Sequence, residues 1–268
     1  MISFNNSDYK YIIYKVKDNI AQIHLNRPKK LNALKYPLLM EIIEVIEKIK
    51  KDKLIRVVTI QGNGSNFSSG DDLKSMGPDG IKFKPLEDGS KLPHHKVIKL
   101  LRELPKPVIA KIEGYCLGAG FELALACDFR LAADNIKMGD HRVNRAHCVM
   151  SGASWMLPRL IGLARATEII LTGKLLNAKE ALEIGLVNRV YPINSFEKES
   201  GEFTKHLANL PTKCIGINKS MLNYSQKNDL FPSLMNEFKL YCKNIATYDF
   251  GEGMRSFREK RDPKYKGK

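Results

Sequence analysis

Two short apolar runs with a helical segment between them constrain the fold most. The runs are IRVVTIQG (55–62) and KPVIAKIEG (106–114), and the apolar spacing of residues 93–103 predicts a helix between them. Apolar runs without polar alternation are typical of strands that are buried on both faces, as in parallel sheets. Because a strand, helix, strand order requires a crossover connection, the sequence predicts an α/β fold around a parallel sheet.

Further elements extend this pattern toward both ends of the chain. The stretch YIIYKVKDNIAQIHL (11–25) alternates around Asp18 and Asn19, which predicts a β-hairpin. Residues 37–51 place their apolar side chains on one stripe and predict an amphipathic helix. Helices are also predicted over 154–161, 164–172 and 177–185, and a short strand over 187–192.

The chain divides into a core and a helical module. Residues 195–257 carry three amphipathic helical stretches and little strand signal. We therefore predict a core over residues 1–194 and a helical module over residues 195–268. Residues 62–93 are rich in glycine, serine and proline without a steady period, which is typical of a functional lid or a disordered loop.

Composition excludes several classes of protein. The longest apolar candidate, residues 155–171, is interrupted by Arg159 and Arg165, so no membrane span is expected. The first residues lack a basic-then-apolar signal pattern, and a cytoplasmic protein is expected. Five cysteines without a C-x-x-C spacing predict reduced, mostly buried thiols, and neither a disulfide framework nor a metal site.

The formal net charge of +15 is compatible with nucleic acid, acidic lipid or a polyphosphate ligand. The lysines are scattered along the chain without interleaved aromatic residues or a nucleic-acid motif. This distribution favours a solvated basic surface over a nucleic-acid partner, and it leaves a negatively charged small ligand possible.

Two glycine-bearing turns carry the clearest chemical signal. SSGDDL (68–73) and LGAGFE (117–122) each follow a predicted strand, and each can expose a backbone N–H group. Two converging N–H groups would form an oxyanion hole, and Glu122 stands in the first turn of the helix that follows the second one. The alternative is that these are ordinary turn glycines and that Glu122 only complements the helix dipole. No nucleophile elbow or phosphate-binding loop is present in the sequence.

Five stretches resemble one known family. They are NRPKKLNAL (26–34), FSSGDDLKSM (67–76), PKPVIAKIEGYCLGAGFELALACDFRLAAD (105–134), LTGKLLNAKEALEIGLVNRVYP (171–192) and FREKRDP (257–263). In this order they resemble the enoyl-CoA hydratase/isomerase, or crotonase, superfamily. The resemblance implies a spiral of β-β-α units with C-terminal helices that assemble trimers, often paired into hexamers. It also implies an acyl-CoA substrate, whose coenzyme A is part of the substrate, and no separate cofactor.

Carried over by position, the resemblance gives each candidate residue a role. It makes the backbone N–H groups of Asp71 and Ala119 the oxyanion hole for a thioester carbonyl, with an enolate as the common intermediate. Glu122 corresponds to the first catalytic carboxylate of the hydratases. Contacts to coenzyme A fall on Lys30, Leu31 and Lys74, with Phe257 and Lys260 reaching the nucleotide of a neighbouring subunit.

One position departs from the family pattern. Arg142 stands where hydratases have their second glutamate, and MSGAS (150–154) replaces a glycine-rich stretch that would line the pocket. Ordinary hydration is therefore not expected, and isomerisation, decarboxylation, C–C hydrolysis or an altered hydration stay open, as does an RNA-binding role with little catalysis. Arg142 can hold a substrate carboxylate, or it can pair with Asp140 or another acid of the wall. The candidates for a second acid or base are Asp140, His141, His147, His94 and His95.

Overall fold

A six-stranded sheet forms the centre of the protein in the computed structural model, which describes residues 9–73 and 92–268. The strand order is β1-β2-β3-β4-β6-β8. Only β1 and β2 are antiparallel, and every later neighbour is parallel, as the crossover pattern predicts. The strands are β1 (Ile12–Lys17), β2 (Ile20–Leu25), β3 (Val57–Gly62), β4 (Val108–Ile112), β6 (Phe129–Ala133) and β8 (Arg189–Tyr191). The predicted α/β architecture is confirmed.

The hairpin turn between β1 and β2 explains their tight pairing. Asp18 and Asn19 both have positive φ angles, 51° and 63°, which a two-residue turn requires when it follows the right-handed twist of the strands. Aspartate and asparagine tolerate this region better than other residues with a side chain. Lys17 pairs with Ile20 directly across the turn, so the predicted hairpin is confirmed.

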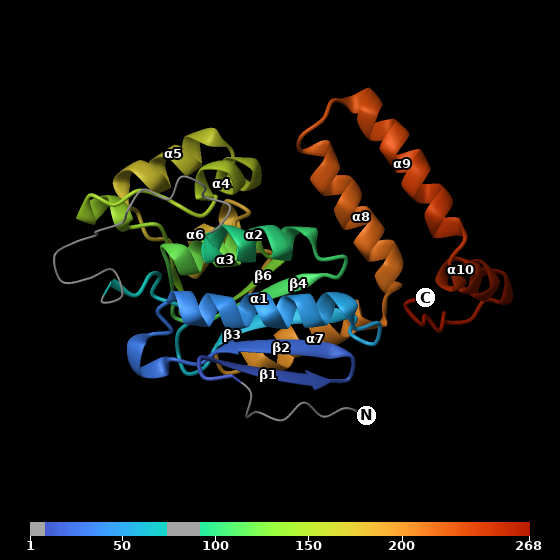
Figure 1. Cartoon of the computed structure of the whole chain (residues 1–268), viewed down its shortest axis with the longest axis horizontal. Coiled ribbons are helices and arrows are strands. Elements are labelled where there is room, and N and C mark those ends of the chain that lie inside the picture. The colour runs from blue at the N-terminus through green and yellow to red at the C-terminus, as the bar shows by residue number, and fades with distance from the viewer. Residues whose placement is uncertain (1–8, 74–91) are drawn as a thin grey trace.

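Both faces of the sheet are buried, which is why its central strands read as continuous apolar runs. Neighbouring residues such as Val57 and Val58 alternate between two separate apolar clusters. The larger cluster lies under α1 (Tyr36–Lys51), α2 (Pro93–Glu103) and α3 (Ala119–Ala126), and the smaller one lies under α7 (Phe196–Asn209). Figure 1 shows α1, α2 and α3 on one side of the strands. Helix α7 therefore packs on the sheet itself.

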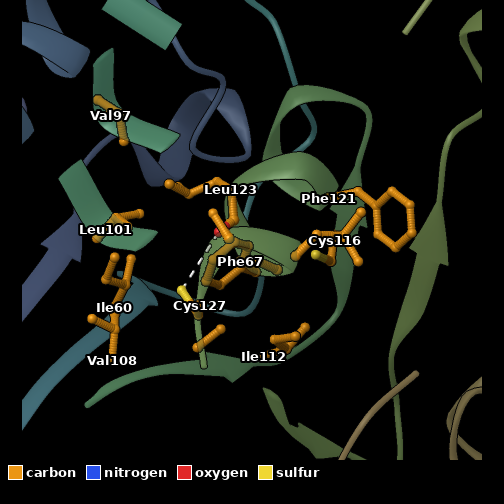
Figure 2. Packing of buried hydrophobic residues seen from close by; sticks show 14 of the residues in the cluster. Ile60, Phe67, Val97, Leu101, Val108, Ile112, Cys116, Phe121, Leu123 and Cys127 are labelled. Carbon is orange, nitrogen blue, oxygen red and sulfur yellow. Dashed lines mark hydrogen bonds between the residues drawn. The ribbon is translucent and has the colours of Figure 1, made fainter. Parts of the chain in front are cut away.

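Figure 2 shows the layer in which α2, α3 and the central strands meet. Phe67 and Phe121 are fully buried there, and the Cys127 thiol lies 3.4 Å from the carbonyl oxygen of Leu123. Burial raises the pKa of Cys127 to about 12, so this thiol stays protonated at neutral pH. The expectation that most cysteines are buried is wrong, because only Cys116 and Cys127 are.

A second, smaller wall runs beside the main sheet and positions the site. Strands β5 (Tyr115–Leu117) and β7 (Lys137–Gly139) pair in parallel. Isolated bridges extend this wall on either side, joining Leu34 to Asp71, Ser68 to Cys116 and Met138 to Leu176. Each turn of the chain thus adds one strand to the main sheet and one short segment to the second wall. This is the spiral that the resemblance implies.

The remaining helices surround this spiral or leave it. Around it lie η1 (Pro28–Lys30), η4 (Arg142–Arg145), α4 (Ala153–Ile161), α5 (Leu163–Thr172) and α6 (Ala178–Glu183). After α7 come α8 (Thr212–Ser225), α9 (Leu230–Ile245) and α10 (Tyr248–Glu259). Figure 1 shows α8 and α9 as an antiparallel pair that projects away from the sheet.

The helical module contains more breaks than its sequence indicates. Four helices, α7 to α10, occupy the part for which three stretches were predicted, so that number is wrong. Pro211 separates α7 from α8, and Thr247 caps α10 with a hydrogen bond from Phe250 N. The boundary between residues 194 and 195 stays a prediction, and most of the predicted lid (62–93) lies outside the described residues.

Candidate functional site

Two backbone turns meet at the centre of the site. Gly70 has a φ angle of 95°, and a Cβ atom at this position would lie 2.8 Å from the Leu117 carbonyl oxygen and 3.4 Å from Ala119 N. No side chain fits between these two turns, and the backbone conformation itself favours glycine. The first turn, which contains Asp71, is therefore packed against the start of α3.

The N–H groups of Asp71 and Ala119 stand out among their neighbours. Gly70 N donates to Ser68 Oγ (3.2 Å), and Asp72 N donates to the Leu34 carbonyl (2.7 Å). Within residues 9–73 and 92–268, neither Asp71 N–H nor Ala119 N–H donates to a backbone carbonyl. For Ala119 the reason is its place as the first residue of a helix, where N–H groups have no intrahelical acceptor. The structure thus brings together the two donors predicted for the oxyanion hole.

Glu122 is fully buried, one helical turn from Ala119. Its Oε1 atom accepts hydrogen bonds from three backbone N–H groups, those of Met150 (3.2 Å), Ser151 (2.7 Å) and Ala153 (3.2 Å). The turn that presents these groups depends on Gly152, whose φ angle is 97°. The segment MSGAS therefore anchors the carboxylate, a role that its side-chain pattern does not reveal.

The other oxygen of Glu122 faces Arg142. Oε2 lies 2.8 Å from Arg142 Nη2, and the same guanidinium donates from Nε to Asp140 Oδ1 (2.9 Å). Burial alone would lower the pKa of Arg142, but hydrogen bonds to Asp140 and the charge of Glu122 outweigh it and raise the pKa. Arg142 is therefore a permanent cation shared between two carboxylates.

The side chain of Asp71 joins this network from the other side. Asp71 Oδ1 lies 3.0 Å from His94 Nε2, and Asp71 Oδ2 lies 3.7 Å from Arg142 Nη1. The ring of Tyr36 packs edge-on against His94, and burial together with the charge of Asp71 raises the pKa of Tyr36. The family resemblance gives Asp71 a role for its backbone N–H group and none for its side chain. Its contact with His94 has no sequence signal, because the two residues meet through the packing of α2.

The candidate second acids and bases lie in different places. His95 Nε2 lies 2.8 Å from the Met150 carbonyl oxygen, beside the turn that holds Glu122. His147 is half-buried, and its ring contacts the carbonyl of Cys148, not Glu122. Burial, with the nearby charge of Arg145, lowers the pKa of His141. Asp140 and His94 are thus the two candidates that the structure joins to the network around Arg142.

The predicted coenzyme A residues are spread over distant elements. Lys30 ends η1, and Leu31 follows it with 42% of its surface exposed. The carbonyl of Leu31 accepts a hydrogen bond from Ser69 N (2.9 Å), which ties this loop to the Asp71 turn. Phe257, 82% exposed, lies on α10, well away from α3 (Figure 1), and Lys260 follows that helix. Lys74 lies outside the described residues.

Known proteins of similar sequence share one family. The sequence model of the enoyl-CoA hydratase/isomerase family matches residues 15–268. The chain is 32% identical to a crotonyl-CoA hydratase of Syntrophomonas wolfei over 254 residues, which cover 94% of this chain and 96% of the relative. It is 33% identical to a trans-2-decenoyl-[acyl-carrier-protein] isomerase of Streptococcus mutans over 269 residues, covering 97% of this chain and 100% of the relative.

Solved structures agree with this result. An enoyl-CoA hydratase of Bacillus anthracis has a TM-score of 0.88 at 34% identity, covering 97% of this chain and 100% of that one. The spiral fold, the paired turns and the sequence matches therefore lead to one conclusion: the chain belongs to the enoyl-CoA hydratase/isomerase family.

Proposed function

We propose that the protein moves a proton on an acyl-CoA thioester through an enolate, as an isomerase, and does not add water as a two-glutamate hydratase. One observation carries this proposal. Glu122 is held by three N–H groups and Arg142, and it stands beside the N–H groups of Asp71 and Ala119, which donate to no backbone carbonyl within the described residues. By the family resemblance, an arginine takes the place of a second proton-exchanging acid.

The contacts of Glu122 suit a base. Hydrogen bonds to a carboxylate and a neighbouring cation both stabilise its negative charge. Oε1 receives the three backbone bonds, so Oε2 is the oxygen left to take a proton. For that step, Oε2 must exchange its contact with Arg142 for the substrate C–H. The shared guanidinium keeps its bonds to Asp140 and can release one partner while it retains the other.

The reaction then follows from charge movement. Glu122 Oε2 removes a proton from the carbon next to the thioester or conjugated with it, and the C–H electron pair moves to the thioester oxygen. The N–H groups of Asp71 and Ala119 hold the resulting oxyanion. Return of the proton from Glu122 to the other end of the allylic system shifts the double bond, so one carboxylate serves both steps.

Arg142 disfavours the hydration alternative. Addition of water benefits from two groups that exchange protons with the same water molecule. A guanidinium does not give up its proton in proteins, and Asp140, a second carboxylate of the network, is bound to Arg142.

A double-bond assay tests this function. Purified protein is incubated with cis-3-hexenoyl-CoA, and the trans-2 isomer and the 3-hydroxy product are separated by chromatography. We expect the isomer to form, and we expect crotonyl-CoA hydration to stay below about 10 per second, a typical enzyme turnover. Efficient hydration without isomerisation would contradict the proposal.

We also propose a homo-oligomer that completes the coenzyme A site. Helix α9 exposes large apolar side chains, among them Leu230 (75%), Phe231 (70%) and Phe238 (67%). Exposed apolar surface of this extent is typical of a subunit interface. In a trimer, Phe257 and Lys260 would reach a neighbour's nucleotide. Light scattering at micromolar concentration checks this, because a monodisperse monomer is incompatible with it.

A further inference from the structure

A cavity of about 910 Å³ lies far from the thioester site. It is bounded by the end of α1, the first half of α8, the last part of α9 and residues 267 and 268. Helix α1 has 16 residues and rises about 1.5 Å per residue, so roughly 24 Å separate this end of the helix from the end near Leu34. The two places can therefore bind ligands separately.

Basic side chains are the main charged groups of this cavity, although more of its wall is apolar than polar. Lys50, Lys53, Arg56, Lys213 and Lys243 line it, and none of these five forms an ion pair within the described residues. Clustered like charges repel each other unless an anion lies among them.

Two other charged side chains of the wall, Lys106 and Asp52, already form hydrogen bonds with backbone groups. Lys106 donates to the carbonyl groups of Ile49 and Asp52 at the end of α1. The side chain of Asp52 accepts a hydrogen bond from Leu54 N (2.8 Å) and so turns toward its own loop. Asp52 is the one aspartate or glutamate side chain on the described wall. Within the described residues, no acidic side chain therefore forms an ion pair with any of these five cations.

Buried donors without acceptors point to the same ligand chemistry. Thr212 is only 7% exposed, and its hydroxyl has no hydrogen-bond partner among the described residues. Arg56 donates from Nη1 to the Ala208 carbonyl (2.9 Å), while its buried Nη2 has no partner there. A Cβ atom on Gly267 would lie 3.4 Å from Arg56 Nε and 3.6 Å from Thr212 Oγ1, so the two side chains lie close together.

The start of α8 adds a third contribution. Thr212 is the first residue of this 14-residue helix, Pro211 provides no side-chain cap, and the first turn contains no acidic residue. The free N–H groups and the helix dipole favour an anion at such an end. Gly216 allows α8 to lie against the loop between α2 and β4, because a Cβ atom at position 216 would be 2.5 Å from the Pro105 carbonyl oxygen.

We propose that this cavity binds a small polyphosphate, either inorganic or the phosphate chain of a nucleotide. Phosphate oxygens can accept hydrogen bonds from guanidinium, hydroxyl and helix N–H donors at the same time. The surrounding lysines add more positive charge than a single phosphate group would neutralise. The cavity is large enough for several phosphate groups and a nucleoside.

Calorimetric titration of the full-length protein with inorganic triphosphate, at about 50 mM salt, tests the proposal without any substrate. We expect saturable binding that becomes at least tenfold weaker in Lys213→Gln/Lys243→Gln and at least threefold weaker in Thr212→Val. The matched control is Lys137→Gln/Lys227→Gln, which removes the same charge from two other exposed lysines outside the cavity and should change affinity less than twofold. Parallel titration with ATP tells whether the nucleoside contributes.

The following results would overturn the proposal. Equal weakening in both double variants, or no binding by wild type, would overturn the proposal. Loss of triphosphate binding in saturating coenzyme A would show that the cavity belongs to the acyl-CoA site, and so would overturn a separate site. Short RNA that binds with the same sensitivity to the variants, while triphosphate does not, would assign the cavity to nucleic acid instead.

Discussion

Two buried glutamates, Glu122 on α3 and Glu252 on α10, contact similar donors, but their roles differ. Glu252 binds Arg261 through both oxygens (2.6 and 3.2 Å) and accepts from Lys264 N (2.9 Å), so it fastens the chain after α10 to that helix. Glu122 has three backbone donors on one oxygen and an arginine on the other.

The difference lies in what surrounds each carboxylate. Arg261 is also shared, because its Nε donates to Glu259 Oε2 (2.6 Å), but its side chain is 38% exposed and so lies at the protein surface. Arg142 is divided between Glu122, Asp140 and, at 3.7 Å, Asp71. The two sites differ in burial and in neighbours: the Arg142 side chain is only 9% exposed, and the nearby N–H groups of Asp71 and Ala119 supply a place for new negative charge. Similar bonding therefore builds a structural clamp in one region and a candidate active site in the other.

The largest expected effect is the loss of activity in Glu122→Gln. The amide keeps an oxygen for the three backbone donors but cannot take a proton, so isomerase turnover should fall by roughly 10²-fold or more. Glu252→Gln is the matched control and should keep turnover within about twofold of wild type, since it lies outside the site. Equal turnover in Glu122→Gln and wild type would remove Glu122 from the mechanism.

Removal of the shared cation should affect stability as well as rate. Arg142→Gln leaves Glu122 and Asp140 buried without a counter-charge, which should lower the free energy of unfolding by about 3 kcal/mol. Arg142→Gln/Asp140→Asn removes one of those charges and should recover part of the loss. Urea unfolding of both variants measures this.

A control arginine sharpens that result. Arg159 is exposed and packs 4.2 Å from the ring of Trp155, so Arg159→Gln should cost less than about 1 kcal/mol. A loss in Arg142→Gln no larger than in Arg159→Gln would contradict the inferred role of the network.

Glu252 should make the stability of the C-terminal region depend on pH. Hydrogen bonds from Arg261 and from Lys264 N lower the pKa of Glu252 from 4.5 to about 2. Because the folded pKa is the lower one, its stabilising effect is complete above pH 4.5 and is lost as the pH falls toward 2. In Glu252→Gln, the difference in unfolding free energy from wild type should therefore shrink between pH 6 and pH 2.5. A constant difference over that range would mean that this carboxylate is not the cause.

Much of the fold could be predicted from sequence because it depends on local patterns. Residues 93–103 form a helix with the predicted bounds, and Asn177 caps α6 with the capping box that includes Glu180. The two turn glycines also carry a local signal, since positive φ angles and close backbone contact need a missing side chain. The two turns and the family resemblance together were therefore enough to predict that Asp71, Ala119 and Glu122 share one site.

The rest of the site depends on contacts that no spacing reveals. Arg142 was predicted to hold a substrate carboxylate or to pair with Asp140 or another acid of the wall, and only its position in the folded chain shows that it contacts both Asp140 and Glu122. The donors of Met150 and Ser151 were missed because they are backbone groups, and the pattern of side chains does not encode their direction. The contact between His94 and Asp71 depends on how α2 packs.

Exchange of the α-proton with solvent tests the central claim most directly. Hexanoyl-CoA, which has no double bond to hydrate or move, is incubated with the protein in deuterium oxide, and deuterium at the α-carbon is followed by mass spectrometry. The account predicts steady incorporation with wild type and incorporation slower by roughly 10²-fold with Glu122→Gln. Absence of deuterium with wild type, or equal incorporation by the two proteins, would contradict an enolate formed by Glu122.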